Sequence, residues 1–158
     1  MVSGGATMKS GMAAAPKPRI FVDADVLVAG SASTSGANHV LLRLSEYTIV
    51  ECLCSEQVIV EAERNLISKL PHALPLFRLL TRSALQVVAD PGADQVAPWT
   101  GHADPKDLPI LAAALAQGCH YLVTFNTRHY RPEATELVVL RPGALLPEIR
   151  ARLADLVP

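Results

Sequence analysis

The chain alternates short apolar runs with longer stretches in which apolar residues recur every three or four positions. Short apolar runs are typical of strands buried in a parallel sheet, and the longer pattern is typical of helices that pack one face against it. The predicted strands are 19–23, 48–53, 85–88, 121–124 and 137–140. The predicted helices are 37–46, a helix that follows Ser55, 71–82, 104–117 and 145–156. This alternation predicts an α/β fold, a doubly wound sandwich whose parallel sheet of about five strands is covered by helices on both faces.

Two of the predicted helices carry further detail. Ser55 is expected to cap the helix that follows it, whose apolar side is formed by Val58, Ile59, Ala62, Leu66 and Ile67. The stretch Asp104-Pro105-Lys106-Asp107 is expected to open another helix, which Gly118 closes. In the simpler interpretation, Asp104 caps this helix and Asp107 compensates its dipole. In the other, an acid is also held at the edge of the sheet to bind a cation.

Composition narrows the class of protein. A chain of 158 residues, half of them hydrophobic, is long enough for one domain with a sizeable core. We expect a disordered leader rich in Gly, Ser and Ala over residues 1–17 and a single domain over 18–158. The formal net charge of -1 excludes a protein coated with positive charge, so any binding of nucleic acid must be local.

The cellular setting is also predicted from the sequence. The three cysteines show no pairing or zinc-type spacing, which favours buried thiols in a reducing compartment: Cys52, Cys54 and Cys119. The long uncharged run from 108 to 127 is interrupted by Pro109 and Gly118, which favours a helix plus a strand over a membrane span. We therefore expect a cytoplasmic protein with no membrane partner.

Acidic residues follow the predicted strands at three places. Asp23 ends the first strand, Glu61 lies on the helix after the second, and Asp104 and Asp107 lie before the fourth. Ligand sites of open α/β sheets lie at the carboxyl ends of the strands, so these acids are expected to converge there. Converging acids repel one another unless a cation lies between them, and oxygen ligands suit Mg²⁺ or Mn²⁺. Such an ion can drive hydrolysis of a phosphodiester by activating a bound water.

Four segments together resemble the PIN-domain ribonucleases, and in particular the VapC-like toxins of bacterial toxin–antitoxin pairs. The segments are VDADVLV, SEQVIVEAERNL, DLPILAAAL and YLVTFNTRHY, and the resemblance covers about residues 18–142. It implies a PIN-like fold, cleavage of RNA with Mg²⁺ or Mn²⁺, a homodimer, and silencing by a small antitoxin protein that fills the acidic crevice, often with an arginine.

The resemblance also implies roles for individual residues. Asp23, Glu61 and Asp107 match the catalytic metal acids, and Asp104 resembles an extra acid that some members place before the helix. Asn126 stands where many members have Asp, so it can offer a carbonyl oxygen to a metal but no charge. Four further residues are expected to orient the metal acids or to meet the substrate: Asp25, Thr124, Arg128 and His129.

Two other functions are considered. Asp23-Ala24-Asp25 also fits the opening motif of haloacid-dehalogenase phosphatases, with Asp23 as nucleophile, Asp25 as acid and Thr124 as the later hydroxyl. That fold needs a Lys and an acidic pair after the Thr, where only Glu133 and Glu136 are available. The second alternative is a PIN-like module that binds RNA or a partner without catalysis, against which the number of acids argues.

Overall fold

The parallel sheet predicted from the sequence is present in the computed structural model, which describes residues 16–133 and 135–157. Its five strands lie in the order β3-β2-β1-β4-β5, and every neighbouring pair is parallel. The strands are β1 (Arg19–Val22), β2 (Glu51–Ser55), β3 (Leu85–Val88), β4 (Tyr121–Val123) and β5 (Val138–Leu140). Except for Pro16 and Lys17, the leader predicted over residues 1–17 lies outside the described residues.

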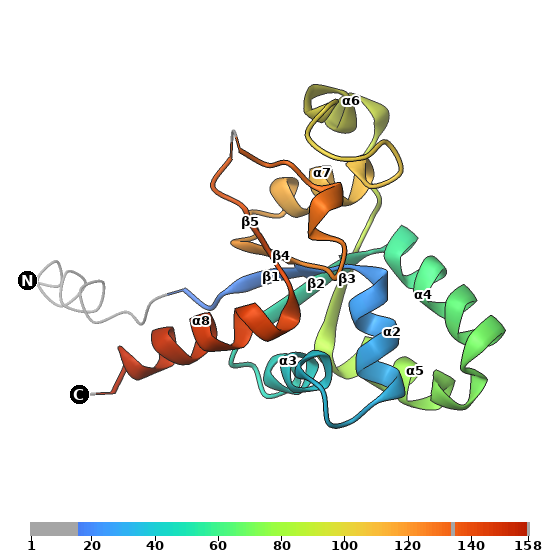
Figure 1. Ribbon diagram of the computed structural model, residues 1–158, viewed down its shortest axis with the longest axis vertical. Helices are drawn as coiled ribbons and strands as arrows, with labels where there is room; N and C mark the ends of the chain where they lie inside the picture. Colours follow the sequence, from blue (N-terminus) through green and yellow to red (C-terminus); the bar gives the residue numbers. More distant parts are fainter. Residues whose placement is uncertain (1–15, 134, 158) are drawn as a thin grey trace, which may run out of the picture.

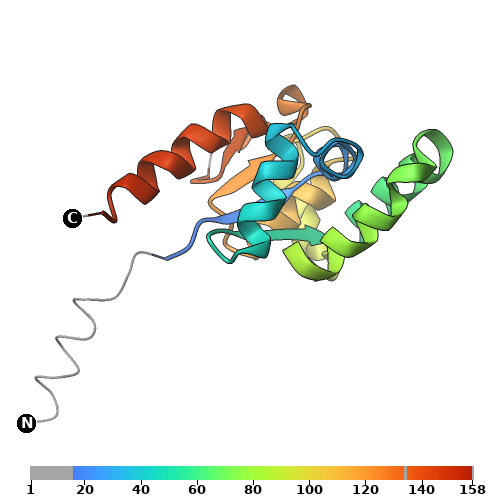
Figure 2. The same ribbon diagram turned by 90° about the horizontal axis from the view of Figure 1, so that it is seen from below.

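Helices cover both faces of the sheet, as predicted. Figures 1 and 2 show α3 and α8 on one face and α7 on the other. The α-helices are α2 (Ala24–Ala32), α3 (Ala37–Glu46), α4 (Glu56–Lys69), α5 (Leu74–Ala84), α6 (Ala93–Val96), α7 (Leu108–Ala116) and α8 (Pro142–Ala154). Three short 3₁₀ helices complete the elements: η1 (Pro71–Ala73), η2 (Ala97–Trp99) and η3 (Thr127–His129). Among the described residues, no helix is both long and apolar enough to cross a membrane.

The strand order explains why the site residues converge. The chain builds β1, β2 and β3 toward one edge, then crosses back to place β4 on the other side of β1. Val22 of β1 pairs with Val123 of β4, so Asp23 and Thr124 leave the sheet side by side. Val22 and Val123, which end these two strands, are fully buried. The strand order reverses between β1 and β4, and such a reversal is the usual ligand site of open α/β sheets.

The largest difference from the prediction is α2, which follows β1 directly and was not predicted. Its sequence, ADVLVAGSA, is apolar almost throughout, so it lacks the polar face that marks a surface helix. The helix is buried between α3, α4 and α5, with Val26 and Leu27 almost inaccessible. Its N-cap is Asp23, and this places the acid at the junction of a strand and a helix.

Several element boundaries also differ. β2 begins at Glu51 rather than at residue 48, because Thr48 has a φ of 62° and lies in a turn. The last helix begins at Pro142 rather than at residue 145, and the first turn of a helix is a favoured position for Pro. Ser55 is the N-cap of α4 as predicted, without a side-chain hydrogen bond. Ile67, predicted on the buried side of α4, is 57% exposed, because the packed stripe of this helix is narrower than the apolar pattern.

Candidate metal centre

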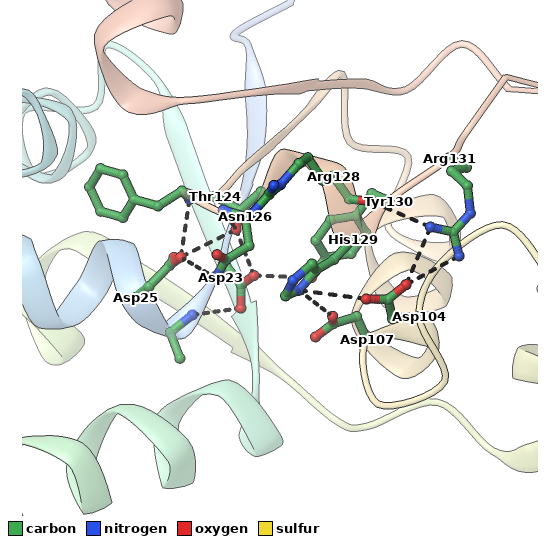
Figure 3. A network of polar contacts seen from close by, with 12 residues as sticks. Asp23, Asp25, Asp104, Asp107, Thr124, Asn126, Arg128, His129, Tyr130 and Arg131 are labelled. Atoms are coloured by element: carbon green, nitrogen blue, oxygen red, sulfur yellow. Dashed lines mark hydrogen bonds and ion pairs between the residues drawn. The ribbon is translucent and has the colours of Figure 1, made fainter.

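Asp23 directly follows the carboxyl end of β1, and its carboxylate is held by three donors. The backbone N–H of Ala24 donates to Oδ1 at 2.8 Å. The hydroxyls of Thr124 and Tyr130 donate to Oδ2 at 2.9 and 3.0 Å. The residue is only 8% exposed. These bonds fix the direction of the carboxylate from the start of α2, the residue after β4 and the residue after η3 (Figure 3).

Tyr130 was not predicted as a site residue. Its side chain is buried, and burial together with the charges of Asp23 and Asp107 raises the pKa of the phenol. The hydroxyl therefore stays protonated and continues to donate to Asp23. Tyr130 ends the segment YLVTFNTRHY, but the sequence gives no sign that its ring turns back toward the first strand.

Asp25 connects the start of α2 to the loop after β4. Its Oδ2 accepts hydrogen bonds from the backbone N–H of Phe125 at 3.0 Å and from the amide nitrogen of Asn126 at 3.2 Å, with the Thr124 hydroxyl at 3.4 Å. Its Oδ1 is buried and has no partner among the described residues. Burial, and then the charge of Asp23, raise the pKa of Asp25 from 3.8 to about 6. These contacts support the expected role of Asp25 in orienting its neighbours rather than in binding substrate.

Asn126 is exposed and uses its amide nitrogen in the contact with Asp25. Its backbone N–H donates to the hydroxyl of Thr124 at 3.1 Å. The backbone and the side chain of Asn126 therefore both bond to residues around Asp23 and Asp25. The side-chain carbonyl oxygen is the only group that Asn126 can offer to an ion, in keeping with the expectation of a neutral ligand.

The raised pKa of Asp25 predicts how stability varies with pH. A carboxyl whose pKa is higher in the folded state favours folding at low pH, and this contribution is lost as the pH rises through the folded value. The melting temperature of the metal-free protein should therefore fall between about pH 4 and pH 7. Asp25→Asn should make this fall shallower, because the amide oxygen can accept the same hydrogen bonds without charge. Melts of wild type, Asp25→Asn and the control Glu63→Gln across this range test it, and an unchanged slope in Asp25→Asn would contradict it.

A second group of side chains, which could hold a metal ion, is formed by Asp104, Asp107 and His129. An antiparallel bridge between Ala103 and Tyr130 joins the two loops, and the N–H of Asp104 donates to the carbonyl of His129 at 2.8 Å. One potential ligand atom from each of the three side chains lies within 4.8 Å of the other two. The sequence placed His129 near the site, but not beside these two acids.

The structure corrects the prediction that Asp104 caps the following helix. That helix, α7, begins at Leu108, and its N-cap position is occupied by Asp107, whose side chain makes no capping hydrogen bond. The Oδ1 atom of Asp104 instead accepts from both terminal nitrogens of Arg131, at 3.2 and 3.3 Å. Gly118, with a φ of 64°, follows the end of the helix as predicted. Helix capping therefore does not explain the two carboxylates.

Asp107 is buried, whereas Glu61 lies on the exposed side of α4. Burial raises the pKa of Asp107, as does the charge of Asp23, and Lys106 and His129 oppose this shift. The pKa of Glu61 is raised by burial and by the charges of Asp23 and Asp107. The charges of Asp23 and Asp107 therefore act on Glu61, although the three residues come from distant parts of the chain.

The residues around this crevice fit a divalent cation. They offer carboxylate oxygens whose ionised forms destabilise one another, and Asp25 adds a buried oxygen with no partner in the described part of the chain. An ion with two positive charges would remove this repulsion, and oxygen-rich sites favour Mg²⁺ and Mn²⁺. Arg128 is exposed on η3 beside the site and makes no ion pair with any residue that the structure describes.

Comparison with known proteins places the fold. A family model described as a PIN domain matches residues 19–128. VapBC2 from Rickettsia felis, solved bound to a DNA fragment from its promoter, is similar in structure with a TM-score of 0.59, at 15% identity over 78% of this chain and 98% of that one. PAE2754 from Pyrobaculum aerophilum has a TM-score of 0.59, at 18% identity over 85% of this chain and 96% of that one. No curated protein matches the sequence.

Proposed function

This chain belongs to the PIN domain family, and from that premise we propose that it is an endoribonuclease that requires Mg²⁺ or Mn²⁺ and serves as the toxin of a type II toxin–antitoxin pair. One observation carries the proposal: one potential ligand atom from each of Asp104, Asp107 and His129 lies within 4.8 Å of the other two. The charges of Asp23 and Asp107 also raise the pKa of Glu61, which supports its place near the same acids. Carboxylates that repel one another destabilise the folded state, and a bound cation would remove this repulsion.

In this proposal, Asp23, Glu61, Asp104 and Asp107 hold the metal, with Asn126 as a neutral oxygen ligand. The metal would supply the Lewis acidity that lowers the pKa of a water molecule and stabilises the leaving oxygen. The protein holds its ligands in place beforehand: Ala24, Thr124 and Tyr130 fix Asp23, and Arg131 fixes Asp104.

Two more residues act around the ligands. Asp25 holds the loop after β4 through the N–H of Phe125, which keeps Thr124 aligned with Asp23. Arg128, exposed on η3, is positioned to meet a phosphate of the RNA backbone.

The phosphatase alternative has less support. It needs Asp25 to donate a proton to a leaving group, but one oxygen of Asp25 accepts from the loop after β4 and the other is buried. It also leaves Glu61 and Asp107 without a role. The alternative of a binding module without catalysis shares the same fold, so only an assay can separate it from the nuclease.

A small antitoxin partner, a homodimer and a cytoplasmic location are part of the same proposal, as is a single domain over residues 18–158. The pairing of Arg131 with Asp104 supports the antitoxin, because it shows that a guanidinium group fits the rim of this crevice. An arginine of a partner protein could pair with the remaining acids in the same way.

The test is cleavage of a mixed RNA pool by the purified protein. We expect cleavage with Mg²⁺ or Mn²⁺, products that carry a 5′-phosphate, and no cleavage in EDTA. Cleavage that persists in EDTA would contradict the proposal. Hydrolysis of p-nitrophenyl phosphate without RNA cleavage would favour the phosphatase, and RNA binding without cleavage in either metal would favour the binding module.

A further inference from the structure

We propose that His129 is a nitrogen ligand of the metal and makes the centre prefer Mn²⁺ to Mg²⁺. This inference rests on the proposed function, because it concerns the same metal. His129 was expected only near the ligands or the substrate. In the structure, Nδ1 of its ring faces the carboxylates of Asp104 and Asp107 (Figure 3).

The backbone fixes His129 opposite the two acids. The bridge between Ala103 and Tyr130 is reinforced by the N–H of Asp104 donating to the carbonyl of His129 and by the N–H of Arg131 donating to the carbonyl of His102 at 2.7 Å. Paired backbone therefore holds the main chain of His129 opposite the two acids, with its ring within reach of their carboxylates. Preorganised ligands of this kind are what a metal site requires.

The shorter of the two distances from His129 to the acids suits neighbouring ligands of one ion. The Nδ1 atom of His129 is 3.1 Å from Oδ2 of Asp107 and 3.9 Å from Oδ2 of Asp104. Adjacent ligands of a six-coordinate ion with bonds of about 2.1 Å lie roughly 3 Å apart, since the bonds meet at right angles. Arg131 donates hydrogen bonds to Oδ1 of Asp104. The other oxygen of this carboxylate, Oδ2, is the one that lies nearer to His129.

A nitrogen ligand changes which ion the site prefers. Mg²⁺ binds oxygen and water almost exclusively, whereas affinity for imidazole increases along the first transition series from Mn²⁺ onward. The centre should therefore bind Mn²⁺ more tightly than Mg²⁺, and more selectively than a variant with an acid in place of His129.

The same geometry allows a competing explanation, in which His129 is a protonated counter-ion of Asp107 and never binds the metal. A counter-ion repels any divalent cation equally. In that case, removing His129 would strengthen the binding of Mg²⁺ and Mn²⁺ by the same factor. The two explanations thus differ in the ratio of the two affinities.

The experiment combines a spectrum and a titration. Electron spin echo modulation of Mn²⁺ bound to the full chain should show coupling to a ¹⁴N nucleus, which His129→Gln should remove and the control His72→Gln, on exposed η1, should retain. Calorimetric titrations should give a Mn²⁺-to-Mg²⁺ affinity ratio at least about tenfold lower in His129→Asp than in wild type.

Each outcome decides the proposal. Bound Mn²⁺ without ¹⁴N coupling in the wild type, coupling that survives in His129→Gln, or an unchanged affinity ratio would overturn the role of His129. The wild-type spectrum needs no variant, so a folding defect cannot obscure it. RNA cleavage that requires Mn²⁺ in a protein without nitrogen coupling would leave the proposed nuclease standing. A protein that binds neither ion would overturn both.

Discussion

Asp107→Asn should abolish RNA cleavage, with a loss of at least about a hundredfold, because losing even an outer partner of a metal ligand costs 10- to 100-fold. Asn is similar in size to Asp and is itself a favoured N-cap, so α7 should still begin at Leu108. The substitution removes one negative charge from a buried position where it faces Asp23. The measurement is the initial rate of cleavage of one RNA oligonucleotide in Mn²⁺.

Matched variants separate the site from the rest of the protein. Asp94→Asn, in exposed α6, should cleave at the wild-type rate. On α4, Glu61→Gln should lose cleavage, whereas Glu63→Gln, two residues further on and weakly paired with Arg78 at 3.4 Å, should not. Full activity in Asp107→Asn would remove this residue from the metal ligands.

Much of this site could be predicted because it depends on periodicity and topology. Five apolar runs identified the strands, and the rule that ligands bind at the carboxyl ends of parallel strands placed Asp23 and Asp107 at the same edge of the sheet. Glu61 lies on α4 beside the stripe formed by the buried Val58, Ala62 and Leu66. These inferences need only the local pattern and the crossover connections.

The rest could not be predicted, because it depends on contacts between loops far apart in the sequence. Tyr130 reaches Asp23 across 107 positions, and Arg131 reaches Asp104 across 27. Both contacts follow from the bridge between Ala103 and Tyr130, which has no signature in the local sequence. The helix α2 was missed for another reason: it is apolar almost throughout and has no polar face, so periodicity cannot distinguish it from a loop of small apolar residues.

Divalent ions should raise the melting temperature of this protein. The raised pKa values of Asp25, Glu61 and Asp107 mean that each ionised carboxylate is less stable in the folded chain than in the unfolded one. These three carboxyls therefore stabilise the fold at a pH below their unfolded pKa values. At neutral pH their ionised forms destabilise it, unless a cation offsets the charge. An ion present at about 100 times its dissociation constant adds roughly 2.7 kcal/mol, or about 5 to 10 °C for a chain of this size.

Asp107→Asn should lose most of this rise, because it removes a ligand and part of the repulsion at once. Its metal-free melting temperature should be slightly higher than that of the wild type. The gain is small because the carboxylate also contributes favourably, through a contact with His129 at 3.1 Å and through the helix dipole, which is worth about 0.3 to 1 kcal/mol. Melts of both proteins at pH 7.5, in EDTA and in Mn²⁺, measure the two effects. A wild type that does not respond to Mn²⁺, or a variant that responds equally, would show that the crevice holds no metal through Asp107.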